Sequence, residues 1–165
     1  MTRVTWANGR GGSGTTTGTT SWTAPGIVLQ LGTNVLTVTA QNAGGQTGMA
    51  SVMLTRTPFT FTDDPLPAQG ALIRAVHIME FREAIDTVRS ARGLASFAWT
   101  DPTIVPGSSP VKGIHLTELR TALNQAYQTA RRPLPNYTDA AVVAGLTPIR
   151  AMHMNQLRAA VLALE

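Results

Sequence analysis

One unit occurs three times in the chain after residue 60, with a spacing of 38 residues from each copy to the next. Each copy opens with an aromatic residue, a threonine and an aspartate, and a histidine follows the aromatic residue after 16 positions. The copies open at Phe61, Trp99 and Tyr137, and their histidines are His77, His115 and His153. A fixed period of this length indicates small units that bury a core only by packing against one another. We therefore expect three helical repeats, at residues 61–98, 99–136 and 137–165.

Apolar residues in each copy recur at the spacing of one buried helix face. In the third copy this face consists of Ile149, His153, Leu157, Ala160, Val161 and Leu164. Helices are predicted from about residues 73, 111 and 149, and the pairs Ser109-Pro110 and Thr147-Pro148 have the sequence of helix caps. Because one such helix would not be stable alone, the pattern predicts a pseudo-threefold helical bundle.

Residues 1–56 have a different character, rich in threonine and glycine with alternating β-branched residues. Strands are predicted around residues 4–6, 27–31, 36–40 and 50–54, separated by glycine-containing turns. Ala50, Val52 and Leu54 are expected to face inward, and Trp6 and Trp22 to fill the core. Thr57-Pro58 is the predicted linker between the two parts.

The first part resembles a known family. Val4-Thr5-Trp6, the Gly11–Gly14 segment, Trp22 and the 32–40 run are similar to the carboxy-terminal part of a bacterial immunoglobulin-like repeat. The resemblance implies a β-sandwich of the kind strung along secreted and cell-surface proteins as spacers or adhesive units. About five strands are predicted, where such a sandwich needs roughly seven. Either the chain belongs to something longer, or another chain supplies the missing strands.

The second part also resembles a family. One sequence motif occurs with small changes at residues 73–82 and 149–158, namely Ile-Arg-Ala-x-His-x-x-Glu-Leu-Arg. It is similar to a repeat of large secreted bacterial proteins. No activity follows from this resemblance. The threefold repetition, the aromatic-x-Asp opening and the Arg-Ala pair also resemble S-layer homology modules, which implies anchoring to anionic cell-wall glycans.

The three histidines lie on the apolar helix faces. The favoured interpretation is a core residue whose ring N–H donates to a backbone carbonyl or to the aspartate of a neighbouring aromatic-Thr-Asp segment. Contact with a ligand is one alternative, and a zinc site made by the imidazoles of His77, His115 and His153 is another. The aspartates are predicted to be N-caps rather than calcium ligands, because calcium needs about six to eight oxygens; they are Asp63, Asp101 and Asp139.

Two sets of cations also recur. Arg74, Lys112 and Arg150 share one position in the first helical turn, and Arg82, Arg120 and Arg158 share a later one. A cation near a helix N-terminus opposes the helix dipole, so the first set requires a partner. Ion pairs between repeats are the favoured interpretation. An anionic glycan is the functional alternative, with Arg74, Lys112 and Arg150 as the candidate ligand-binding residues.

Composition excludes several classes of function. The net charge of +4 comes from 13 basic and 9 acidic residues without a dense basic run, so nucleic acid is not an expected partner. The chain has no cysteine, hence no disulfide, and no apolar stretch long enough to span a membrane. No nucleophile motif or pair of carboxylates indicates catalysis. We predict no enzyme activity and no cofactor.

Together these observations predict a multidomain chain, all-β followed by all-α. A partial immunoglobulin-like sandwich at 1–56 would precede a three-repeat helical bundle at 57–165. The predicted role is a structural or adhesive module of an extracellular or cell-surface protein, assembled by strand donation with other copies of itself or with a neighbouring chain. Binding of a cell-wall or extracellular glycan is the alternative.

Overall fold

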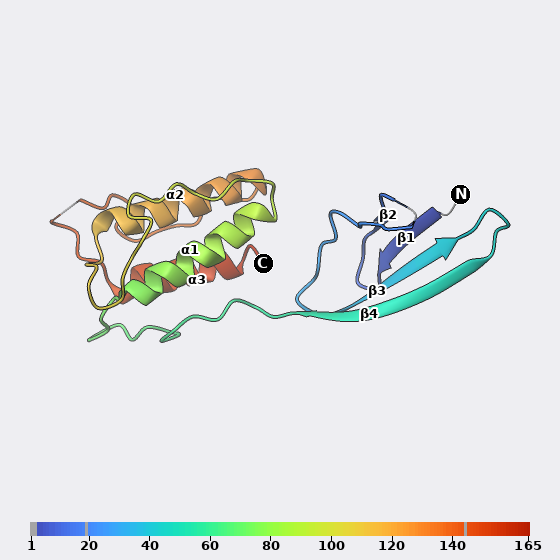
Figure 1. Ribbon diagram of the computed structural model, residues 1–165. Helices are drawn as coiled ribbons and strands as arrows, with labels where there is room; N and C mark the ends of the chain where they lie inside the picture. Colours follow the sequence, from blue (N-terminus) through green and yellow to red (C-terminus); the bar gives the residue numbers. More distant parts are fainter. Residues whose placement is uncertain (1–2, 19, 144) are drawn as a thin grey trace. The chain divides into compact units, whose positions relative to one another are not determined.

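The computed structural model describes residues 3–18, 20–143 and 145–165. The chain divides into two compact units, Met1–Pro58 and Phe59–Glu165, which we call the N-terminal and C-terminal units (Figure 1). The N-terminal unit holds a four-stranded antiparallel sheet and the C-terminal unit holds three α-helices. The predicted mixture of β and α structure is therefore confirmed.

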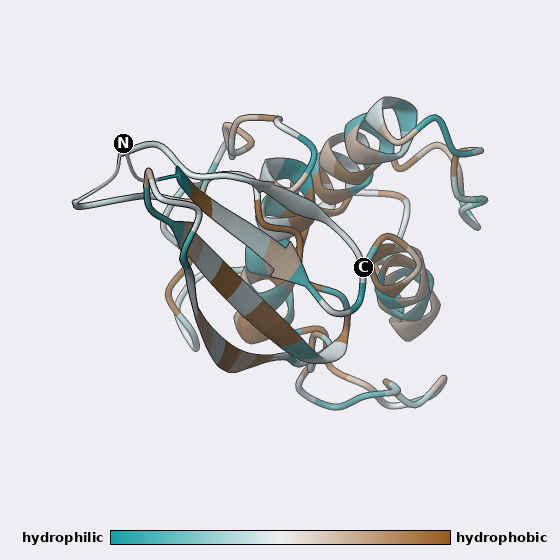
Figure 2. Cartoon of the chain, turned by 90° about the vertical axis from the view of Figure 1, so that its right-hand side faces the viewer, coloured by the Kyte–Doolittle hydropathy of each residue, from teal (hydrophilic) through white to brown (hydrophobic). Residues whose placement is uncertain are grey.

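The sheet has the strand order β2-β1-β3-β4. Its strands are β1 (Arg3–Asn8), β2 (Ser13–Thr15), β3 (Gly32–Gln41) and β4 (Thr47–Arg56). Hydrophobic and polar residues alternate along much of β3, whereas β4 contains the consecutive apolar residues Val52, Met53 and Leu54; the bands on the strands in Figure 2 show the hydropathy of each residue. Every residue of β4 is paired with β3 in one unbroken register, from Thr47 opposite Gln41 to Arg56 opposite Gly32.

Trp6 is buried, as predicted, together with Val4 and Leu36 on the same face of the sheet. Its indole ring lies over Gly14 of β2, where the Cβ of any other residue would come within 2.9 Å of the ring nitrogen. Glycine at this position therefore gives the tryptophan the space it needs. The other predicted core tryptophan, Trp22, is 43% exposed, so that prediction was wrong.

The segment 27–31 was also predicted wrongly, because it forms no strand. Side chains form hydrogen bonds with the backbone groups of this segment that would otherwise pair with a neighbouring strand. The Asn34 amide bonds both the N–H and the carbonyl of Gln30, at 2.9 and 2.7 Å. Asn8 and Arg56 donate to the carbonyls of Val28 and Leu29. These bonds hold the segment as a loop against the sheet.

The described residues of the N-terminal unit form one sheet, rather than two sheets facing each other. Ala50, Val52 and Leu54, expected to face inward, are exposed because no second layer of the described N-terminal unit covers β4. These three residues lie on one face of β4, as predicted, but the predicted burial is not present.

The helices of the C-terminal unit are α1 (Ala75–Ser90), α2 (Gly113–Thr129) and α3 (Ala151–Leu162). Each one contacts both of the others. The shared core contains apolar residues with no exposed surface from every helix. The large ones are Ile78, Phe81, Ile85, Leu116, Leu119, Leu123, Met154, Leu157 and Val161. No helix in the described ranges is long and apolar enough to cross a membrane.

The helices begin two residues later than predicted, and the predicted caps do not cap them. The hydroxyls of Ser109 and Thr147 instead accept the N–H groups of Val105 and Val143, each at 2.9 Å, and so close the preceding loops. The aspartates are not N-caps either, since no helix starts beside them. The true N-cap residues are Arg74, Lys112 and Arg150.

Candidate functional site

The three histidines occupy the same environment in the three copies. Each is fully buried or 1% exposed, and each is the third residue of its helix. Ring atom Nδ1 accepts the backbone N–H of the N-cap residue, at 3.1 Å for His77, 3.2 Å for His115 and 3.2 Å for His153. Because Nδ1 is an acceptor, the neutral ring carries its proton on Nε2.

Each Nε2 then donates to the aspartate of its own copy. The distances to Oδ2 are 3.2 Å for His77–Asp63, 2.8 Å for His115–Asp101 and 3.1 Å for His153–Asp139. The predicted contact between histidine and aspartate is confirmed. What the sequence did not indicate is the other half of the arrangement, in which the imidazole takes the place of the glutamate or glutamine in a capping box.

The backbone at the aspartates differs between copies for a local reason. Asp63 and Asp139 have φ values of 53° and 50°, in the left-handed region that aspartate tolerates better than most residues. Asp101 is followed by Pro102, whose ring favours an extended backbone at the preceding residue. All three aspartates nevertheless reach their histidine.

Two of the aspartates also bind the cation at the N-cap. Arg74 donates to Oδ2 of Asp63, and Lys112 Nζ lies 2.8 Å from Oδ2 of Asp101. The hydrogen bond from Arg74 is the main cause that lowers the pKa of Asp63, and that from Lys112 does the same for Asp101. For Arg74 and Lys112 the required partner is therefore a carboxylate of the same copy, so the favoured interpretation of ion pairs between repeats was wrong for these two residues. Arg150 is exposed at the equivalent place.

These lowered pKa values predict a loss of stability in acid. A carboxyl group whose pKa is lower in the folded protein than in the unfolded chain stabilises the fold above its unfolded value, here 3.8, and ceases to do so as the pH falls through the folded value. We expect the midpoint of urea unfolding of the C-terminal unit to fall as the pH drops below about 4. Asp101→Asn should weaken this pH dependence, whereas Glu83→Gln, which removes an exposed carboxylate, should leave it unchanged. An equal effect of the two variants would contradict the assignment.

A second contact holds the aromatic-Thr-Asp segment against its own helix. The side chain three residues after each histidine accepts the threonine N–H, at 3.0 Å for Glu80, 2.9 Å for Glu118 and 3.1 Å for Gln156. This contact was not predicted from the sequence. Its signal was available, because an acceptor, glutamate or glutamine, follows the threonine after 18 residues in every copy.

The later set of arginines connects one copy to the next. Arg82 donates to the carbonyl of Asp101 at 2.6 Å and lies over the Trp99 ring at 4.9 Å. Arg120 donates to the carbonyl of Asp139 at 2.7 Å and lies over the Tyr137 ring at 4.7 Å. The contacts run between repeats, as predicted, but the partners are carbonyls and aromatic rings more than carboxylates.

The third arginine of this set returns to the first copy. Arg158 donates to the carbonyls of Thr62 and Asp63 at 2.6 and 2.8 Å, and lies 5.4 Å from the centre of the Phe61 ring. The order of contacts is therefore first copy to second, second to third, and third to first. We call the arginines Arg82, Arg120 and Arg158 the ring arginines.

Burial of the ring arginines is nearly complete, with exposed fractions of 7%, 5% and 2% in chain order. This burial lowers the pKa of Arg82 and Arg120, although a guanidinium stays charged at neutral pH.

Other hydrogen bonds also connect the third copy to the start of the C-terminal unit. The Asn155 amide bonds both backbone groups of Leu66, and Phe59 N–H donates to Glu165.

The described residues contain no group of three or more histidine, aspartate and glutamate side chains placed to hold a metal ion. Both nitrogens of each imidazole are already engaged, so His77, His115 and His153 present no free lone pair to zinc in this structure. Ligation would require each helix to lose the bond at its N-cap.

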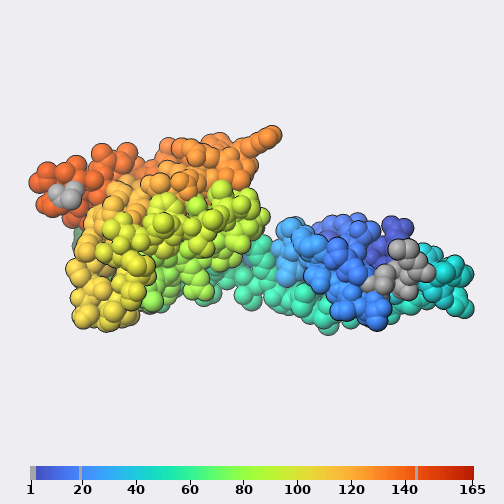
Figure 3. Space-filling view, turned by 45° about the horizontal axis from the view of Figure 1, so that its top comes forward, coloured from blue at the N-terminus to red at the C-terminus, as the bar shows by residue number. Residues whose placement is uncertain are grey.

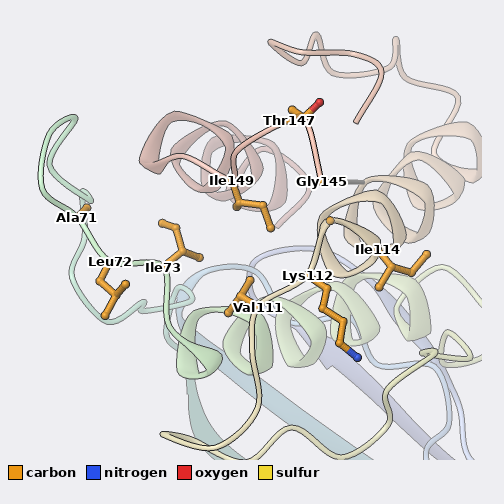
Figure 4. A pocket seen from close by; sticks show the side chains of 10 residues that line it. Ala71, Leu72, Ile73, Val111, Lys112, Ile114, Gly145, Thr147 and Ile149 are labelled. Atoms are coloured by element: carbon orange, nitrogen blue, oxygen red, sulfur yellow. The ribbon is translucent and has the colours of Figure 1, made fainter. Parts of the chain in front are cut away.

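A surface pocket of about 710 Å³ lies where the three helices begin. Ile73, Val111 and Ile149, each two residues before its helix, turn toward one another there (Figure 4). Leu72 and Ile114 at the edge are 74% and 42% exposed. The pocket is thus built from equivalent apolar residues of all three copies, and Lys112 on its border is bound to Asp101.

No protein family model matches this chain, and neither curated proteins nor solved structures give a significant match.

Proposed function

We propose that this chain is a non-enzymatic structural or adhesive module of an extracellular or cell-surface protein. The observation that carries the proposal is that the recurring polar side chains act within the protein. The histidines serve the helix caps and the aspartates, and the ring arginines join successive copies. Side chains engaged in this way maintain a shape and are not available for a substrate. The extracellular location rests on the resemblance to secreted bacterial repeats.

We propose a pseudo-threefold helical bundle for the C-terminal unit and an incomplete immunoglobulin-like sandwich for the N-terminal unit. The cyclic order of the arginine contacts supports the first assignment. Exposed Val52 and Leu54 on the apolar side of the sheet support the second, because a facing layer would cover them.

We further propose that the N-terminal unit assembles with another polypeptide by accepting a strand. In the order β2-β1-β3-β4, strand β4 is an edge, and all of its residues but Arg56 are exposed. An edge of this length is a template for pairing with a further strand.

Glycan binding through Arg74, Lys112 and Arg150 is the function against which this proposal is tested. Arg74 and Lys112 are held by Asp63 and Asp101, so an anionic sugar would have to displace a carboxylate. Such competition disfavours strong binding, since a surface ion pair already provides each cation with its counter-charge.

The test is salt elution from immobilised polygalacturonate, a linear polyanionic polysaccharide. One variant combines Arg74→Gln, Lys112→Gln and Arg150→Gln. A control of equal net charge combines substitutions at exposed arginines elsewhere, namely Arg3→Gln, Arg10→Gln and Arg131→Gln. We expect both variants to elute at the same salt concentration, because only their equal net charge affects retention. Earlier elution of the first variant would replace the structural role by glycan binding.

A further inference from the structure

The free edge of β4 lacks the features that protect edge strands from pairing. Thr47 to Thr55 contain no charged residue and no proline, and Arg56 is the strand's only charge. The unbroken register with β3 contains no bulge. Natural edge strands usually carry a lysine, a proline or a bulge for this purpose. In the space-filling view the atoms of β4 (teal) form part of the visible surface of this unit (Figure 3).

We propose that the strand received by β4 is β4 of a second copy of this chain, in antiparallel orientation. This inference rests on the proposed assembly role and names its partner. The single charge determines the orientation. A parallel pair would bring the two Arg56 side chains together, whereas an antiparallel pair places them at opposite ends.

The alternation of the strand restricts the register. Residues directly opposite each other in an antiparallel pair point to the same face. Two identical strands related by a twofold axis meet this condition only when one residue lies directly opposite its own copy, with the axis midway between the two. The two registers with the greatest overlap are centred on Ser51 and on Val52. In both, Val52 and Leu54 of each copy extend the apolar face of the other, and an eight-stranded sheet results.

The absence of cysteine makes cross-linking a direct test. At the twofold axis a residue lies opposite itself, with a Cα–Cα distance of about 4.5–5.5 Å, which a disulfide can span. We expect Ser51→Cys or Val52→Cys, but not both, to form the dimer under mild oxidation at least about tenfold faster than Met49→Cys. Met49 is 69% exposed on the same strand but lies away from either axis, so the control measures random collision.

Light scattering of the unmodified chain provides a second measurement that needs no cysteine. We expect the average mass to rise from monomer toward dimer between about 10 µM and about 1 mM, the range of a weak association. Val52→Lys should shift this rise to higher concentration. Val28→Lys should not, because Val28 is a 65% exposed residue outside the strands.

A monomer over the whole range, or equal cross-linking at residues 49, 51 and 52, would overturn self-pairing. Neither result would affect the structural role of the C-terminal unit, because that role is tested by elution from the polysaccharide. Earlier elution of the glycan variant would remove the structural role without changing the mass of the protein in solution. The two failures are therefore distinguishable.

Discussion

Replacing Arg158 by methionine is expected to lower the free energy of unfolding of the C-terminal unit by about 3–4 kcal/mol. Methionine keeps much of the side-chain volume but removes the donors. The carbonyls of Thr62 and Asp63 would then lose their donor, and Asp64 would lose its ion pair with Arg158. A hydrogen bond from a charged donor contributes about 1.5–3 kcal/mol, and loss of the contact with the Phe61 ring adds to this.

Arg158 differs from an ordinary surface arginine because its contacts join the two ends of the unit. Its partners in the first copy precede it by 95 and 96 residues. Without it, the segment opening at Phe61 would be attached to α3 mainly through Asn155 and Leu66. We therefore expect amide exchange to accelerate first at residues 59–66, before the core of the helices opens.

The measurement is urea unfolding followed by circular dichroism at the helix signal, with Arg131→Met as the control. Arg131 is exposed, so its substitution removes the same charge at a cost within about 0.5 kcal/mol. The same measurement on Arg82→Met and Arg120→Met gives the loss of stability for the contacts that join consecutive copies. Equal unfolding midpoints for Arg158→Met and Arg131→Met would show that the closure from third copy to first contributes nothing to stability.

The sequence predicted the part of this fold that depends on local periodicity. Helix faces recur every three or four residues, so Phe81, Leu119 and Leu157 could be placed in the core before their neighbours were known. The burial of the three histidines could be predicted from the same spacing. The aspartate partner was accessible because each aspartate precedes its histidine by 14 residues in every copy.

The helix starts were predicted wrongly because a serine or threonine followed by proline occurs both at a helix N-cap and at the end of a hydrogen-bonded loop. Ser109-Pro110 and Thr147-Pro148 have the composition of a cap, yet their hydroxyls close a loop four residues earlier. The distinguishing fact is that His115 and His153 already occupy the N–H at the true cap. From one sequence, the serine or threonine hydroxyl and the histidine ring are equally acceptable as the group that caps the helix.

The contacts of the ring arginines and the exposure of β4 could not be read from the sequence for a different reason. Arg158 meets the first copy only when all three helices are assembled. Val52 and Leu54 share one face of β4, which indicates that this face prefers burial but not whether another part of the N-terminal unit covers it. Both features depend on tertiary structure rather than on local pattern.

The second large effect is expected at His115. Replacing His115 by alanine should lower the free energy of unfolding by about 3 kcal/mol, because it empties a buried site and removes a hydrogen bond at each ring nitrogen. His115→Gln should cost about half as much, since glutamine at this position of a helix can accept the N-cap N–H as in a capping box. Thr121→Ala, on the exposed side of α2, should change stability by less than about 0.5 kcal/mol.

A site-specific readout separates the capping role from simple filling of space. In the native protein the Lys112 N–H is bound to Nδ1 of His115 and should exchange slowly with solvent. We expect that amide to exchange fast in His115→Ala and to remain protected in His115→Gln, while amides in the middle of α2 stay protected in both. If the glutamine variant loses protection at Lys112 as completely as the alanine variant does, the ring contributes its volume and not its lone pair. Burial alone would then explain why a histidine occurs at this position in all three copies.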